Sequence, residues 1–233
     1  ESIFTGTNNF VSDTITSSRL NEYFGFTQAE VDQLLQDTGL TDHAEDLKAW
    51  YDGYHFGEFD IYCPWDVMNY LQDLQFDPSK KPVSYWKNTS DNAIIRSFID
   101  YSGPSISKKL ELLLSGGYIV QTIEEDLTYD YLHSSEDNLW SILYLTGYLT
   151  RVREIPPSDG SIALMIPNAE VKEIFRSTIQ KWFKDSSQTW NRQAMFQALW
   201  AGDSETLTKE IGKLLRKTIS YHDYKEDFYH AFL

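Results

Sequence analysis

The chain of 233 residues contains a single cysteine, Cys63. One thiol cannot form a disulfide within the chain, which excludes a disulfide-stapled scaffold and indicates a reducing compartment. No apolar run approaches the ~18 residues of a membrane-spanning helix. The first residues also lack the basic and apolar regions of a signal peptide. We therefore expect a soluble cytoplasmic protein that does not associate with a membrane.

Basic residues are also scarce. Lys and Arg together number 20 against 35 Asp and Glu, which leaves a net charge of −15. A protein whose whole surface contacts nucleic acid needs Lys and Arg to displace counterions from the phosphates, so the composition disfavours that class. No Lys or Arg occurs between Lys109 and Arg151, which predicts an anionic surface region there.

Familiar catalytic signatures are missing. The sequence has no Gly-x-x-x-x-Gly-Lys-[Ser/Thr] phosphate loop, no Gly-x-Gly-x-x-Gly, no Cys-x-x-Cys and no Gly-x-Ser-x-Gly. His222, Glu226 and His230 are four residues apart and would share one helix face as metal ligands. A solvated helix surface explains that spacing more simply. We predict no metal site and no catalytic residue in this chain.

Aromatic rings, in contrast, are abundant at one place. Residues 50–71, WYDGYHFGEFDIYCPWDVMNYL, hold two Trp, four Tyr and two Phe around Gly57. The rings could cage a ligand or stack on bases, but they alternate beside Gly and Pro, which favours a twisted hairpin in a packed corner. We expect Tyr54 and Trp65 to be buried there, against helices at 28–37 and 64–74.

Apolar residues at helical spacing, separated by caps and breakers, predict helices in series with few strands. A capping box at Thr27 begins the first helix and Gly39 ends it. The predicted helices are 28–37, 42–52, 64–74, one capped by Ser90, one opened by Pro104, 138–146, one capped by Asn168 that reaches 183, and stripes over 190–199 and 207–219; the predicted strands are 119–123, 127–132, 148–154 and 162–166. The fold class is therefore mainly α with small β-hairpins. Helix, hairpin, helix over 138–183 is the order of a winged-helix module, or of a packing unit without a ligand.

Seven blocks of the sequence resemble one known family, in the same order and over nearly the whole chain. They are SIFTGTNNF (2–10), FGFTQAEV (24–31), WYDGYHFGEFDIYCPWDVMNYL (50–71), YWKNTSDNAIIRSFI (85–99), NLWSILYLTGYLT (138–150), IPNAEVKEIF (166–175) and SYHDYKEDFYHAFL (220–233). Together they resemble the AAA-ATPase-like family. In that family a P-loop ATPase core precedes this region, and a PD-(D/E)XK nuclease-like domain follows it.

The resemblance implies five segments. They are a remnant of the ATPase core (1–20), a helical lid (21–117), a winged-helix-like region (118–185), a helical hairpin (186–219) and the truncated start of the nuclease-like domain (220–233). Both catalytic centres would lie outside the chain, whose partners would be the missing core and nuclease-like domain. The expected function is a non-catalytic region that couples the two.

The resemblance also implies where cofactors would lie. The chain itself would hold none, whereas ATP and Mg would bind the full-length protein, with Thr5, Asn8 and Asn9 near the nucleotide. Glu226 matches a first-helix acid of the nuclease-like domain.

A winged-helix module that binds nucleic acid is the alternative, because Arg151 and Arg153 flank the expected wing. Charges on the following helix are nearly balanced: Lys172, Arg176, Lys181 and Lys184 stand against Glu170, Glu173 and Asp185.

Overall fold

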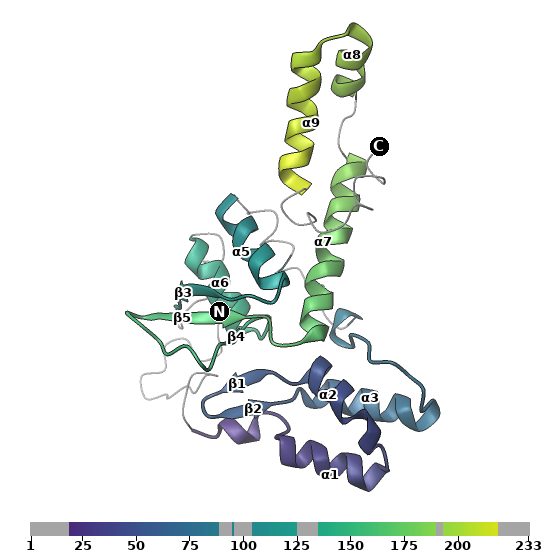
Figure 1. Ribbon diagram of the computed structural model, residues 1–233, viewed down its shortest axis with the longest axis vertical. Helices are drawn as coiled ribbons and strands as arrows, with labels where there is room; N and C mark the ends of the chain where they lie inside the picture. The colour runs from purple at the N-terminus through teal and green to yellow at the C-terminus, as the bar shows by residue number, and fades with distance from the viewer. Residues whose placement is uncertain (1–18, 89–94, 96–103, 125–134, 190–192, 219–233) are drawn as a thin grey trace, which may run out of the picture.

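The computed structural model describes residues 19–88, 95, 104–124, 135–189 and 193–218. Over these residues the chain is mainly helical with two small antiparallel sheets, which confirms the predicted fold class (Figure 1). Several sequence predictions lie outside the described residues: those for Thr5, Asn8 and Asn9, the helix capped by Ser90, the strand at 127–132, Trp190, and the tail with His222, Glu226 and His230.

The first unit is helical. Its elements are η1 (Asn21–Tyr23), α1 (Gln28–Thr38), η2 (Thr41–His43), α2 (Ala44–Tyr51) and α3 (Pro64–Phe76). The capping box is present, since Glu30 N donates to Thr27 Oγ1 at 3.4 Å and Thr27 N donates to Glu30 Oε2 at 2.8 Å. These helices share one buried core: Val31, Leu35, Leu47, Tyr51, Tyr62, Val67, Tyr70, Leu71 and Leu74.

Tyrosine hydroxyls hold the segment that follows α3 onto this core. Tyr51 donates to the Val83 carbonyl at 2.9 Å, and Tyr70 donates to the Lys80 carbonyl at 3.1 Å. Tyr85 donates to the Asp73 carboxylate at 2.6 Å. The rings are buried or half-buried while each hydroxyl is hydrogen bonded, so apolar packing and polar anchoring come from the same side chains. The segment ends in η3 (Trp86–Asn88), which contacts α7 (Ala169–Thr189).

The second unit combines a three-stranded sheet with helices. Its elements are α5 (Pro104–Leu114), β3 (Ile119–Thr122), α6 (Glu136–Leu145), β4 (Thr150–Arg151), β5 (Ser161–Met165) and α7. The strands are antiparallel in the order β3-β5-β4, with Ile119 opposite Leu164 and Thr150 opposite Met165. Its core includes Ile106, Leu110, Leu139, Trp140, Leu143, Leu164, Val171, Ile174 and Phe175.

The strand predicted at 148–154 is much shorter in the structure. Only Thr150 and Arg151 form β4. Leu149 N donates to the Leu143 carbonyl at 3.0 Å, which keeps it in the turn after α6. Arg153 instead reaches Asp60 of another sheet. The apolar pattern over residues 148–154 therefore indicated buried side chains correctly, but it did not predict how many residues pair with β5.

The hairpin of β1 (Tyr54–Phe56) and β2 (Phe59–Ile61) joins the two units. Tyr54 pairs with Ile61 in its register, and both side chains belong to the core of the second unit. Tyr62, one residue on, belongs to the core of the first. Tyr54 is buried as predicted, at 7% exposed, but among α5–α7 residues rather than against α1 and α3.

The prediction for Trp65 was wrong. Its side chain is 54% exposed, on a face of α3 that it shares with the exposed Met68 and Phe76. Trp65 and Met68 are three residues apart, and Met68 and Phe76 are eight apart, so all three lie on the same side of the helix. The face that α3 buries instead carries Val67, Tyr70, Leu71 and Leu74.

At the other end of the chain, α8 (Gln193–Ala201) and α9 (Ser204–Thr218) pack against each other. Figure 1 shows this pair extending beyond the end of α7, away from both sheets. Of the helices that the structure describes, none has the length and hydropathy of a bilayer-spanning segment.

The corrected burial changes what substitutions in the aromatic corner should do. Tyr62→Ala removes a fully buried ring and should lower the free energy of unfolding by about 3–5 kcal/mol. Trp65→Ala should change it by less than about 1 kcal/mol, because its ring is largely in water. Chemical denaturation measures both. Equal effects would show that Trp65 is buried in solution.

Candidate functional site

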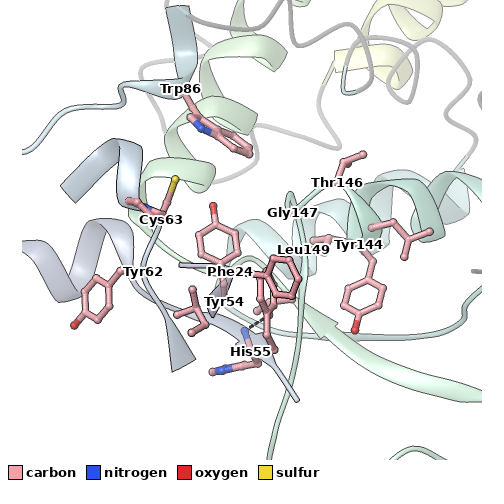
Figure 2. A pocket seen from close by; sticks show the side chains of 15 residues that line it. Phe24, Tyr54, His55, Tyr62, Cys63, Trp86, Tyr144, Thr146, Gly147 and Leu149 are labelled. Atoms are coloured by element: carbon pink, nitrogen blue, oxygen red, sulfur yellow. Dashed lines mark hydrogen bonds between the residues drawn. The ribbon is translucent and has the colours of Figure 1, made fainter. Parts of the chain in front are cut away.

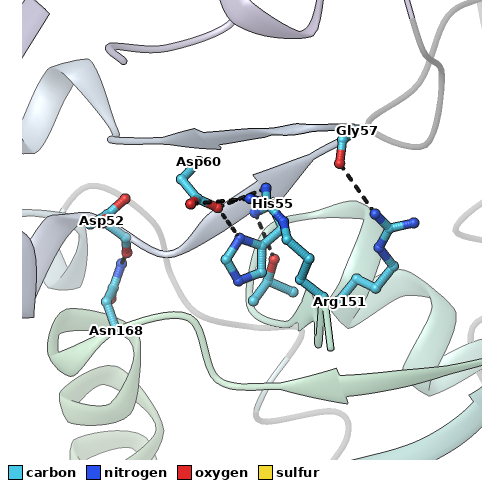
Figure 3. A network of polar contacts seen from close by, with 8 residues as sticks. Asp52, His55, Gly57, Asp60, Arg151 and Asn168 are labelled. Carbon is cyan, nitrogen blue, oxygen red and sulfur yellow. Dashed lines mark hydrogen bonds and ion pairs between the residues drawn. The ribbon is translucent and has the colours of Figure 1, made fainter. Parts of the chain in front are cut away.

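The two units meet in a polar joint, where the hairpin and α2 face β4 and the start of α7 (Figure 3). Asn168 Nδ2 donates to the Asp52 carbonyl at 2.8 Å, and His55 N donates to Thr150 Oγ1 at 2.9 Å. Arg151 donates to the Gly57 carbonyl at 3.2 Å. Backbone groups of one unit are thus bonded by side chains of the other, which fixes the register of the hairpin on the sheet.

Asp60 organises the charged edge of this joint. His55 Nδ1 is paired with its carboxylate across the hairpin. Arg153 contacts the same carboxylate at 2.8 Å from Nη2 and 3.3 Å from Nη1. Exposed pairs of this kind add little stability one by one. The Asp60 pair directs Arg153 toward the hairpin, and the Gly57 carbonyl does the same for Arg151.

Gly53 allows the two units to approach each other at the joint. It has φ of +97°, and a Cβ placed there would overlap the Pro167 carbonyl group of the other unit. Glycine is therefore required at position 53 for two reasons: other residues rarely adopt this φ, and a side chain would not fit against Pro167.

Two acids are buried behind the joint. Asp66 lies in the first turn of α3 and Glu170 in the first turn of α7, and each is only 1% exposed. Trp86 N donates to Glu170 Oε1 at 2.9 Å. Neither oxygen of Asp66 receives a hydrogen bond from a backbone or side-chain N–H of the described residues. Within the described part of the chain, no Lys or Arg forms an ion pair with either acid.

The two carboxyl groups are close neighbours, and each affects the pKa of the other. Burial raises the pKa of Glu170 to about 8, and the neighbouring Asp66 adds to that rise. Burial also raises the pKa of Asp66, which the adjacent Cys63 thiol and Glu170 carboxyl partly offset. Two adjacent buried carboxylates strongly resist ionising together, so the pair favours a state in which at least one of them keeps its proton.

Other titratable groups around the pair are neutral. Burial raises the pKa of the Cys63 thiol to about 12, and Asp66 adds to it, so this sulfur is not a thiolate nucleophile at neutral pH. Burial likewise raises the pKa of the Tyr54 phenol well above its ordinary value. Cys63 and Tyr54 therefore add no negative charge beside the two acids at neutral pH.

An apolar pocket lies beside the acid pair (Figure 2). Its volume is about 230 Å³. Tyr54, Cys63 and Trp86 line it and also neighbour the acids. The remaining wall comes from Phe24, from the hairpin and from the turn over Tyr144–Thr150. The aromatic corner is thus packed, as predicted, and also leaves a hollow between the units.

Of the described residues, the basic ones that the sequence singled out are neither in the pocket wall nor in an ion pair with the two acids. Lys109, the last basic residue before the acidic stretch, pairs with Glu136 at 2.6 Å and lies over the Trp140 ring. On α7, Lys172 is half-buried whereas Arg176 and Lys181 are exposed. Among the described residues, no group of three His, Cys, Asp or Glu side chains is arranged to hold a metal ion.

Neither Asp66 nor Glu170 stands out in the sequence. Acids are common in the first turn of a helix, where the helix dipole favours negative charge. The available signal was position: Asp66 falls within the apolar stripe of α3, and Glu170 directly precedes the buried Val171. Asp66 and Glu170 are far apart in the sequence, and only the fold brings them together.

Comparison with known proteins gives one distant similarity. A protein of Azotobacter chroococcum mcd 1, described as an "Uncharacterized protein in vnfD 5'region", is 25% identical to this chain over 177 residues. The match covers 73% of this chain and 30% of that protein. The chain therefore spans less than a third of the length of this relative. No family model matches the sequence, and no solved structure matches the chain.

The acid pair should make stability depend on pH. Because the pKa of Glu170 is raised from 4.5 to about 8, the folded state holds a proton that the unfolded state releases between these values. Stability should therefore fall as pH rises from about 5 to 9, by roughly 2–4 kcal/mol. Glu170→Gln should flatten this fall, since an amide beside Asp66 lets that acid ionise.

Denaturation at several pH values measures this dependence. Glu173→Gln, on the same helix but half-exposed and paired with Lys87 at 3.5 Å, is the matched control and should keep the fall. A wild-type profile parallel to that of Glu170→Gln would contradict the raised pKa of Glu170.

Gly53 should be far less replaceable than another glycine of positive φ. Gly39 has φ of +69° with no atom near the position that a Cβ would occupy, so Gly39→Ala should lower stability by about 1 kcal/mol. Gly53→Ala adds a backbone overlap with Pro167 and should lower stability by about 3 kcal/mol or more. Thermal unfolding compares them. Equal shifts would mean that the two units are not in contact at this point.

Proposed function

We propose that this chain is a non-catalytic coupling region of an AAA-ATPase-like protein. In this proposal the helical unit is a lid on a P-loop core that binds ATP and Mg. The three-stranded-sheet unit is a winged-helix-like module that leads to a PD-(D/E)XK nuclease-like domain. Closure of the lid on nucleotide would move the second unit through the joint. The whole protein's activity and partners are part of this proposal.

The observation that carries the proposal is the joint itself. A coupling region must transmit displacement between two bodies, and here each unit has its own core while the hairpin contributes to both. Gly53, Asn168 and the acid pair connect the bodies at a small number of specific contacts. Transmission between domains requires an interface that can shift between discrete arrangements, and an interface with few contacts has few to exchange.

Topology supports the winged-helix-like part. A helix, a strand, a further helix and then two strands joined by a loop occur in the order α5, β3, α6, β4, β5. The last strand lies between the other two, as β3-β5-β4. This arrangement agrees with a small winged-helix sheet, and fold likeness of this kind supports architecture but not binding.

The length of the relative also agrees with a multidomain protein. The match covers only 30% of the protein of Azotobacter chroococcum mcd 1, which leaves room there for other domains. The three sequence blocks between residues 24 and 99 and the two between 138 and 175 remain the basis for the family assignment.

The nucleic-acid alternative has less support. In helix-turn-helix proteins the second helix enters the groove with its N-terminal residues. Here α6, which precedes β4, begins with Glu136 and Asp137, and most of its length is buried. Arg151 and Arg153 are bonded to the hairpin. Phosphate contacts would need these groups to change partners.

The coupling proposal predicts nucleotide-dependent protection at the joint. In a polypeptide that joins the P-loop core to this chain, ATP and Mg should slow hydrogen exchange in residues 50–62 and 166–171. Gly53→Ala should abolish that response while Gly39→Ala keeps it. Unchanged exchange at the joint in a protein that binds ATP would overturn the proposal.

The chain alone provides a second measurement for the same prediction. Titration calorimetry with Mg-ATP should give a dissociation constant above about 10 μM, because the phosphate cradle is absent from this sequence.

A salt-titrated DNA-binding assay tests the nucleic-acid alternative. Micromolar, salt-sensitive binding at physiological salt would favour the nucleic-acid module instead.

A further inference from the structure

The pocket between the units has the lining of a site for an organic cation. Aromatic rings from separate elements border it, namely those of Phe24, Tyr54, Phe56, Tyr62, Trp86 and Tyr144. The 15 residues drawn around it include no Lys, Arg, Asp or Glu, and the one His, His55, is paired with the Asp60 carboxylate (Figure 2). Ring faces carry partial negative charge, and groups of them attract ammonium ions, quaternary ones in particular.

Size sets a limit on the ligand. An apolar cavity of about 150 Å³ holds a benzene molecule. The pocket here, of about 230 Å³, is therefore large enough for a trimethylammonium group with a short chain attached. It is too small for a nucleotide or a peptide to enter as a whole.

The charge beside the pocket selects among ligands of that size. Asp66 and Glu170 are two buried acids next to residues of the pocket wall, and no Lys or Arg of the described residues pairs with them. The start of α3 and of α7 supply only the partial positive charge of helix dipoles. A buried charge without a full counterion favours a cation nearby, because the surroundings screen it weakly.

Three side chains connect the charge to the pocket. Trp86 offers its ring to the cavity while its backbone N–H donates to Glu170 at 2.9 Å. Cys63 lies between the cavity and Asp66, with which it interacts. The Tyr54 ring lines the cavity and is affected by the charges of both acids. A cation in the pocket would thus be one side chain away from the pair.

We propose that this pocket binds a small organic monocation of the quaternary or alkylated ammonium class. The rings of Trp86, Tyr54 and Phe24 surround its head group, and the Asp66–Glu170 pair supplies the counter-charge. Because the pocket is formed by both units, the bound cation stabilises their contact. This site is independent of the proposed coupling role and exists in the chain by itself.

The test compares two probes of one shape. Choline carries a trimethylammonium head, and 3,3-dimethylbutan-1-ol replaces its nitrogen by carbon and has no charge. Titration of the chain followed by protein NMR should give a dissociation constant for choline at least about tenfold lower than for the alcohol. Equal constants, or no binding of choline up to about 50 mM, would overturn the proposal.

The acid pair is tested by removing its charge in two steps. Glu170→Gln keeps the Asp66 carboxyl beside an amide donor, so the preference for choline should persist. The double variant Asp66→Asn/Glu170→Gln is neutral and keeps a donor-acceptor pair, so the preference should fall to about one. A preference that survives in the folded double variant would show that the pair does not act on the ligand.

The aromatic wall is tested at two positions. Trp86→Leu should weaken choline binding at least about fivefold. Phe24→Leu, at a ring that is 60% exposed and hence replaceable without loss of the fold, should weaken it in the same direction. Trp200→Leu, on α8 and 84% exposed, is the matched control and should leave binding unchanged. Loss of binding in the control, or none at Phe24 and Trp86, would contradict the assignment.

Discussion

Two carboxyl groups that are buried side by side strongly resist ionising together, and this constraint acts where the two units meet. Asp66 and Glu170 lie in the first turns of α3 and α7, so the starts of two helices from different units meet at a point where retaining a proton is favoured. Trp86 is drawn to the same point by its N–H bond to Glu170. The hairpin then closes over the acids, and the pocket is the space that this packing leaves beside them.

The density of aromatic rings in residues 50–71 follows from a hairpin that must satisfy two cores. Tyr54 and Ile61 contribute to one core and Tyr62 to the other, so apolar surface is needed on both faces of a short ribbon. Tyr62 also donates to Gln28 at 2.8 Å, which keeps its hydroxyl bonded while the ring is buried. Aliphatic side chains would fill the same volume, but they would leave the polar ends of these contacts unmet.

Local signals predicted the helices well and the site poorly. Thr27, Glu30 and Gly39 act within one helix, and so do Pro64 and the stripe of α3, so their spacing in the sequence is enough. Trp65 was misplaced because a ring near a turn suggests a corner, whereas its neighbours on α3 decide which face is buried. The short β4 was not predicted, and Arg153 just beyond it pairs with Asp60, a residue of another sheet that no local pattern indicates. Asp66 and Glu170 become a pair only after both units have folded.

Burying polar groups in the joint between two units costs free energy of desolvation. Replacing a buried charged pair by apolar side chains of similar volume often leaves a protein as stable or more stable. The observed joint rests instead on a few specific features: two buried acids, a glycine, one asparagine bond and an apolar pocket. On the proposed coupling role, that is the useful property: a contact of modest strength can be shifted by nucleotide-driven closure on one side and by a bound cation on the other, because both act on the same few groups.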